Sequence, residues 1–163
     1  MLDDEMLALL GHGAACVRVA KRDKMPVGMA WHTLASSVAD VIGRWISGGY
    51  NVGILLGHGS LIDIEYDDAG GRRLLEQMGL ADARTPTYTS GRGEHRLFRL
   101  AESLPCCGWR KHGGLEIRFG GKPAQSVLPP SRHPDGNAYR WTISPQDCAP
   151  AAVRLSDLSL EVM

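Results

Sequence analysis

The stretch Leu61-Ile62-Asp63-Ile64-Glu65 shows the pattern that organises the chain, because apolar residues alternate with acidic ones along it. Alternation with a period of two predicts a strand that buries Ile62 and Ile64 on one face and presents Asp63 and Glu65 on the other. Side chains two residues apart lie about 6.6 Å apart on one side of a strand. Two such carboxylates can therefore converge on one hard divalent cation, such as Mg²⁺, which prefers oxygen ligands.

A second alternating segment, Leu115-Glu116-Ile117-Arg118, repeats the pattern and presents Glu116 opposite its apolar residues. Between the two segments, Arg92-Gly93-Glu94-His95 supplies a histidine. Acidic side chains from two strands, with a histidine nearby, are the groups that metal-assisted phosphoryl chemistry uses. An ordinary half-buried strand with solvated acids gives the same alternation, so the pattern alone leaves both interpretations open.

Along the rest of the chain, the sequence pattern predicts both helices and strands toward the N-terminus and mostly strands toward the C-terminus. This order is typical of an α+β architecture with a largely antiparallel sheet. We expect strands 50–56 and 61–65 to be consecutive and joined by a hairpin-like turn. Ser37 and Asp40 fit a capping box at the start of a helix, and Asp67 or Asp68 is expected to cap another. The expected helices are residues 2–10, a segment from the capping box to 47, and one carrying Leu74, Leu75 and Met78; the other expected strands are 14–20, 85–90, 95–100, 115–119, 125–128 and 137–142.

Length and composition predict one globular domain spanning residues 1–163, without room for a helicase or zinc domain. The net charge is zero, but residues 92–140 hold nine Lys or Arg against four acids, so a polyanion could bind there. A solvated surface explains this excess equally well. No apolar stretch reaches the roughly 20 residues that a membrane span needs, and the first residues are acidic where a secretory signal is basic. We therefore expect a cytoplasmic protein without a membrane partner.

The cysteines favour a reducing compartment and no zinc site. The four cysteines show no CxxC spacing, and two of them are adjacent. A zinc set of Cys106, Cys107, His112 and Cys148 lacks the short, fixed spacing that zinc ligands usually show.

Six segments occur in a fixed order along the chain: Lys24-Met25-Pro26 with Trp31, Tyr50 to Gly57, Asp63-Ile64-Glu65, Thr89 to His95, Leu115 to Arg118, and a closing signature from Pro129 to Trp141. In this order they resemble the primase-polymerase (prim-pol) domain of the archaeo-eukaryotic primase superfamily. The resemblance covers nearly the whole chain, with two departures. Many relatives have a serine two positions before the histidine, where this chain has Gly93, and many are fused to a helicase, which no part of this chain resembles.

The resemblance implies the archaeo-eukaryotic primase catalytic core, in which an N-terminal α/β unit packs on an RRM-like, mostly antiparallel sheet. It also implies template-directed DNA primase and polymerase activity on single-stranded DNA, with nucleoside triphosphates as substrates. Two Mg²⁺ or Mn²⁺ ions would be held by Asp63, Glu65 and Glu116. The triphosphate would be held by His95 and Arg118, with Arg92 and Lys122 as weaker candidates.

Two other functions remain open at this point. One is a non-catalytic module that binds nucleotides or single-stranded nucleic acid in a replication complex, and the other is a metal-dependent phosphodiesterase. Prim-pol domains are often fused to a helicase, so a fused or separate replicative helicase is an expected partner.

Overall fold

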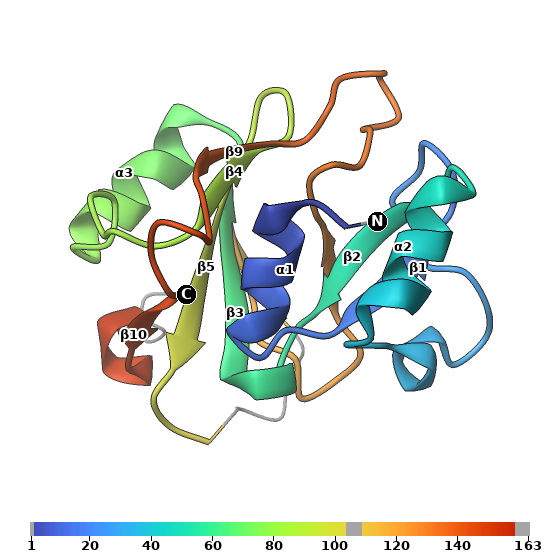
Figure 1. Cartoon of the computed structure of the whole chain (residues 1–163). Helices are drawn as coiled ribbons and strands as arrows, with labels where there is room; N and C mark the ends of the chain where they lie inside the picture. Colours follow the sequence, from blue (N-terminus) through green and yellow to red (C-terminus); the bar gives the residue numbers. More distant parts are fainter. Residues whose placement is uncertain (1, 104–108, 159–163) are drawn as a thin grey trace.

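The computed structural model describes residues 2–103 and 109–158, and it confirms the α+β class (Figure 1). The described residues contain three α-helices, α1 (Asp4–Gly11), α2 (Ala39–Ser47) and α3 (Ala69–Gln77). The strands are β1 (Cys16–Val19), β2 (Asn51–Leu55), β3 (Leu61–Tyr66), β4 (Thr87–Thr89), β5 (Glu94–Leu100), β6 (Trp109–His112), β7 (Leu115–Arg118), β8 (Gln125–Val127), β9 (Arg140–Ile143) and β10 (Ala151–Val153). Short 3₁₀ helices occupy Trp31–Leu34, His58–Ser60 and Leu155–Leu158.

The strands form two sheets. The small sheet has the order β1-β2-β8, and the large sheet has the order β6-β7-β3-β5-β4-β9. All of these pairings are antiparallel, while β10 runs parallel to the second half of β5. The strand β3, which carries the acidic motif, therefore lies inside the large sheet between β5 and β7.

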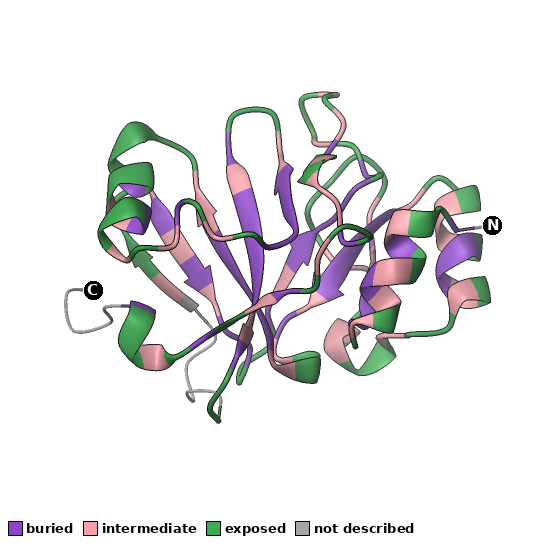
Figure 2. Cartoon of the chain, turned by 60° about the vertical axis from the view of Figure 1, so that its left-hand side comes forward, coloured by how far each residue is buried: buried purple, intermediate pink, exposed green. Residues whose placement is uncertain are grey.

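Two hydrophobic clusters lie on opposite faces of the large sheet. Ile62 and Ile64 of β3 pack with Leu75 of α3 in one cluster. Leu61, from the same strand, belongs to the other cluster, which also holds Ile42 of α2 and Ile54 of β2. Figure 1 shows the same arrangement, with α3 on one side of β3 and β5 and with α1 and α2 on the other. Figure 2 shows that the buried residues concentrate in the strands, whereas the outer helix surfaces are exposed.

Aspartate caps begin two of the helices. Asp3 Oδ1 accepts a hydrogen bond from the Met6 N–H at 2.8 Å at the start of α1. Asp68 Oδ1 accepts one from the Gly71 N–H at 2.7 Å at the start of α3. Each bond satisfies a backbone donor that the first helical turn leaves without a partner. Of the two expected candidates, Asp67 and Asp68, the residue that caps α3 is therefore Asp68.

Two expectations about local structure are wrong. Strands β2 and β3 do not form a hairpin, because β2 pairs with β1 and β8 whereas β3 pairs with β5 and β7. The capping box at Ser37 is also wrong, because α2 begins after Val38 without a side-chain cap. Ser36 Oγ accepts a hydrogen bond from the Val38 N–H at 3.0 Å instead.

Two strands, β6 and β10, were not expected from the sequence, and the expected strand 137–142 is shifted to Arg140–Ile143. Cys106 and Cys107, two members of the rejected zinc set, lie outside the described residues. In the part of the chain that the structure describes, no helix has the length and apolar character needed to cross a bilayer.

Candidate functional site

A polar row crosses the large sheet on the face that is turned toward the small sheet. Strand pairing places Glu65 directly opposite Glu116 on one side and His95 on the other. Tyr88 continues the row beyond His95. Because directly opposite residues project from the same face of an antiparallel sheet, residues separated by many positions in the sequence meet at this row.

Asp63 lies beside this row and is fully buried. Its Oδ2 atom accepts hydrogen bonds from His95 Nδ1 at 2.7 Å and from Ser126 Oγ at 2.5 Å. Burial by itself raises the pKa of a carboxyl group, but the charges of His95 and Arg118 and the hydrogen bonds to Oδ2 outweigh it. The net effect lowers the pKa of Asp63, so the group is an anion at neutral pH. Its second oxygen, Oδ1, is buried and has no hydrogen-bond partner among the described residues.

Arg118 joins three carboxylates. Its Nη1 atom lies 2.7 Å from Glu65 Oε2 and 3.3 Å from Asp63 Oδ2, and its Nη2 atom lies 3.0 Å from Glu116 Oε1. Burial lowers the pKa of a guanidinium, but these three neighbours outweigh it and raise the pKa of Arg118. Arg118 is therefore a permanent counter-charge for Asp63, Glu65 and Glu116, which we call the acidic cluster.

His95 is held by two contacts that fix the plane of its ring. The ring stacks on Tyr88 with centroids 4.5 Å apart and planes inclined by 5°, while Nδ1 is bonded to Asp63. Its Nε2 atom is turned toward Glu65, whose Oε1 atom lies 3.6 Å away. Burial lowers the pKa of His95, but the Asp63 carboxylate more than offsets this effect and the net shift is upward. With Nδ1 bonded to Asp63, Nε2 is an N–H donor when the ring is protonated and a free ligand atom when the ring is neutral.

Three of these side chains are close enough to share one cation. Asp63, Glu65 and His95 each offer a ligand atom, and these atoms all lie within 4.8 Å of one another. Two carboxylates and an imidazole suit Mn²⁺, and the carboxylates also suit Mg²⁺. The unpartnered Oδ1 of Asp63 fits this interpretation, because a buried anionic oxygen without a donor is costly unless a cation binds it. Glu116 lies outside this close group and is bonded to Arg118, so its role as a metal ligand stays a prediction.

Two cavities open beside Glu65. The smaller, of about 90 Å³, is lined by His95, Arg118 and Ser126, among others. The larger, of about 480 Å³, is lined by Arg92 and by the segment around His133. Glu65, Lys24 and Ser90 line both cavities. The larger volume lies within the range of about 300 to 1,000 Å³ that is typical of small-molecule sites.

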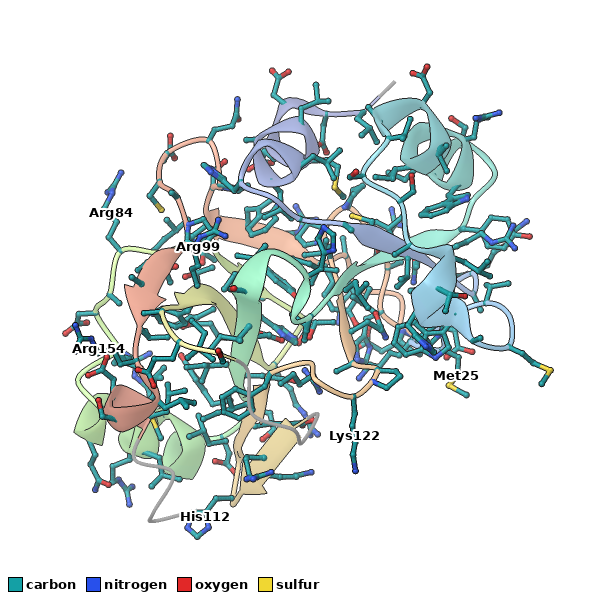
Figure 3. All side chains as sticks on the ribbon, turned by 90° about the horizontal axis from the view of Figure 1, so that it is seen from below. Met25, Arg84, Arg99, His112, Lys122 and Arg154 are labelled. Atoms are coloured by element: carbon teal, nitrogen blue, oxygen red, sulfur yellow. The ribbon has the colours of Figure 1, made fainter. Side chains whose placement is uncertain are left out.

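The two weaker phosphate candidates differ in their positions. Arg92 lines the larger cavity next to Glu65. Lys122 is exposed in the loop between β7 and β8, and its side chain extends outward from the surface (Figure 3). The geometry therefore favours Arg92 over Lys122 as a group near the acidic cluster.

Ser126 and Tyr88 are site residues that the sequence patterns did not indicate. Ser126 belongs to β8 of the small sheet, so it connects the two sheets at Asp63. A single serine in a short strand carries no distinguishing signal. Tyr88 is fully buried, and its position across from His95 follows only from the register of β4 and β5.

A comparison with protein families identifies the family of the chain. The family described as bifunctional DNA primase/polymerase, N-terminal, matches residues 6–153, which include every residue of the acidic cluster. A search of curated proteins finds no match.

Proposed function

The chain belongs to the bifunctional DNA primase/polymerase N-terminal family, and from this premise we propose that it is a template-directed nucleotidyltransferase. In this proposal it acts as a DNA primase and polymerase on single-stranded DNA, with nucleoside triphosphates as substrates. The observation that carries the proposal is the unpartnered Oδ1 atom of Asp63, buried beside Glu65 and His95.

We assign Asp63, Glu65 and Glu116 as the carboxylates that would hold two divalent ions, Mg²⁺ or Mn²⁺. When bound, such ions lower the pKa of the attacking hydroxyl group and neutralise the pyrophosphate that leaves. Asp63 and Glu65 are supported by their close approach to each other. Glu116 is supported by its position directly opposite Glu65 and by the ion pair with Arg118, which connects it to the other two carboxylates.

His95 and Arg118 are assigned to the triphosphate. The stacked, hydrogen-bonded ring of His95 presents its Nε2 atom to the smaller cavity, where it can donate to a phosphate oxygen. Arg118 has a planar guanidinium fork suited to phosphate oxygens, and it lines the same cavity. Arg92, in the larger cavity, is a further phosphate contact, and Lys122 is the weakest of the four. Together these donors would hold the triphosphate in line for attack and stabilise the charge that develops on it.

The finer parts of the assignment follow the family. The large sheet is proposed to be the RRM-like sheet of the archaeo-eukaryotic primase core, and residues 1–163 a single catalytic domain. A fused or separate replicative helicase is a proposed partner, and a cytoplasmic location is proposed as well.

A primer-extension assay tests the proposal. The protein is incubated with a primed single-stranded template, labelled deoxynucleoside triphosphates and Mn²⁺, with EDTA in a parallel reaction. Extension that EDTA abolishes supports the proposal. An unchanged primer would indicate a non-catalytic binding module, and a shortened one a metal-dependent phosphodiesterase; either result overturns it.

A further inference from the structure

Two arginines line a third cavity, apart from the acidic cluster, and two more basic side chains lie over a tyrosine of its lining. This cavity, of about 170 Å³, is lined by Arg22, Arg132, Tyr50 and Asn51, among others. The Arg18 guanidinium and the Lys21 ammonium lie over the Tyr50 ring, 4.8 Å and 5.2 Å from its centroid. Lys24 follows on the same loop. We call this group the basic strip; it consists of Arg18, Lys21, Arg22, Lys24 and Arg132.

The charge of the basic strip is not neutralised by neighbouring acids. Across residues 2–103 and 109–158, no carboxylate forms an ion pair with any of its five members. Asp23, the acid inside the same loop, accepts a hydrogen bond from the Lys24 backbone N–H at 2.6 Å. Asp135, near Arg132, is engaged by Asn137 and His133. Unpaired cations around a cavity attract anions.

A buried side chain holds the two loops of the basic strip together. Asn51 Nδ2 donates to the Asp23 carbonyl at 3.0 Å and to the Arg132 carbonyl at 2.7 Å, and its Oδ1 atom accepts from the Arg132 N–H at 3.0 Å. Asn51 is 5% exposed. The loop of Arg22 and the loop of Arg132 therefore lie at a fixed separation. A surface that binds a ligand with evenly spaced charges requires such a separation.

The basic strip is continuous with the acidic cluster. Lys24, two residues after Arg22, lines both cavities beside Glu65. His133, the residue after Arg132, lines the larger of them. The same two loops therefore lie between the basic cavity and the cavities beside Glu65, so an extended anion can contact both.

We propose that the basic strip binds the phosphodiester backbone of a single nucleic-acid strand and directs that strand to the acidic cluster. This inference rests on the proposed function, which supplies the strand as substrate. Contacts to phosphates position a strand without reading its bases, so the binding should be independent of sequence. It should also weaken steeply with salt, because cations that bind phosphates release condensed counterions.

The test measures binding of a fluorescent single-stranded oligonucleotide by anisotropy, in EDTA and without nucleotides, at several salt concentrations. The variant is the double substitution Arg22→Gln and Arg132→Gln, which removes two exposed charges. Each phosphate contact to a single strand contributes about 0.7 to the salt slope of log K. Loss of two contacts should lower the slope by about 1.4 and weaken binding about 25-fold at 0.1 M salt.

The matched control is the double substitution Arg84→Gln and Arg154→Gln, which removes the same charge from two exposed residues. Figure 3 shows both on the side of the molecule away from Met25, the neighbour of Lys24. The control should bind like the wild type. A third variant, Arg22→Lys with Arg132→Lys, keeps the charges and should retain most of the salt slope.

An unchanged slope in the Gln variant, or an equal loss in the control pair, would overturn the inference. Primer extension separates it from the proposed function. If the wild type extends primers and the Gln variant binds the oligonucleotide normally, only the proposed role of the basic strip is refuted. A wild-type protein that extends nothing, while the Gln variant loses binding, refutes the nucleotidyltransferase and leaves the basic strip supported.

Discussion

Replacing Arg118 by methionine should destabilise the metal-free protein and make its stability depend strongly on Mn²⁺. Arg118 is the guanidinium that contacts Asp63, Glu65 and Glu116 at 2.7 to 3.3 Å. Without it, the three carboxylates face one another, and only Asp63 among them keeps a direct bond to His95. Breaking a buried ion pair by removing one partner costs about 3 to 5 kcal/mol.

The lower end of that range applies, because the Arg118 side chain is 22% exposed and water screens part of the interaction. A loss of about 3 kcal/mol in a chain of this size lowers Tm by roughly 6 to 12 °C. In the wild type, a cation must compete with Arg118 for the carboxylates, whereas in the variant it does not. Mn²⁺ should therefore raise the Tm of the variant by several degrees more than that of the wild type.

Thermal denaturation in EDTA and in millimolar Mn²⁺ measures both effects. Arg96→Met is the matched control, because Arg96 forms a 2.7 Å ion pair with Glu94 and both project from the opposite face of β5. It should lose stability without any additional recovery in Mn²⁺. If Mn²⁺ stabilises Arg118→Met no more than it stabilises the wild type, the three carboxylates do not form the metal site.

Three further predictions concern the same site. Glu116→Gln should lower the rate of primer extension roughly 10³-fold, since loss of a metal ligand removes several kcal/mol of transition-state stabilisation, while Tm stays within a few degrees of the wild type; near-normal extension would exclude Glu116 as a ligand. Ser126→Ala should cost about 1 to 2 kcal/mol of stability, because Asp63 Oδ2 loses a buried donor, and should weaken Mn²⁺ binding measured by calorimetry; unchanged affinity would show that Ser126 does not position Asp63. Burial lowers the pKa of His95, but Asp63 outweighs it and raises the folded-state pKa above the usual 6.5. The contact therefore adds stability that is complete below about pH 6.5 and is lost as pH rises through the folded pKa. The Tm in EDTA should fall over that interval in the wild type and stay flatter in His95→Gln, and equal pH profiles would contradict the assigned contact.

The alternating segments were the part of the fold that the sequence predicted best. Alternation is a local property, so the orientation of Asp63 and Glu65 opposite Ile62 and Ile64 could be predicted without knowledge of strand partners. The predicted hairpin between strands 50–56 and 61–65 is wrong because strand pairing depends on residues that are far apart in the sequence. The strand β2 pairs with β8, which comes much later in the chain.

One residue carried a signal for that pairing. A Cβ atom at Gly53 would lie 3.1 Å from the backbone carbonyl oxygen of Ser126, so β8 passes unusually close to β2 at this glycine. Glycine inside a strand often marks such a close approach. No comparable signal existed for Ser126, because a serine that donates to a buried carboxylate looks the same in sequence as one exposed to water.

The pairing of β2 with β8 also affects how the chain folds during its synthesis. Gly53 and Val127 are partners, and every strand from β3 to β7 lies between them in the sequence. Such a separation slows folding, because a long loop must close before the contact forms. A growing chain would carry β2 as an open edge until β8 leaves the ribosome. Its apolar residues Val52 and Ile54 would be exposed to aggregation during that interval.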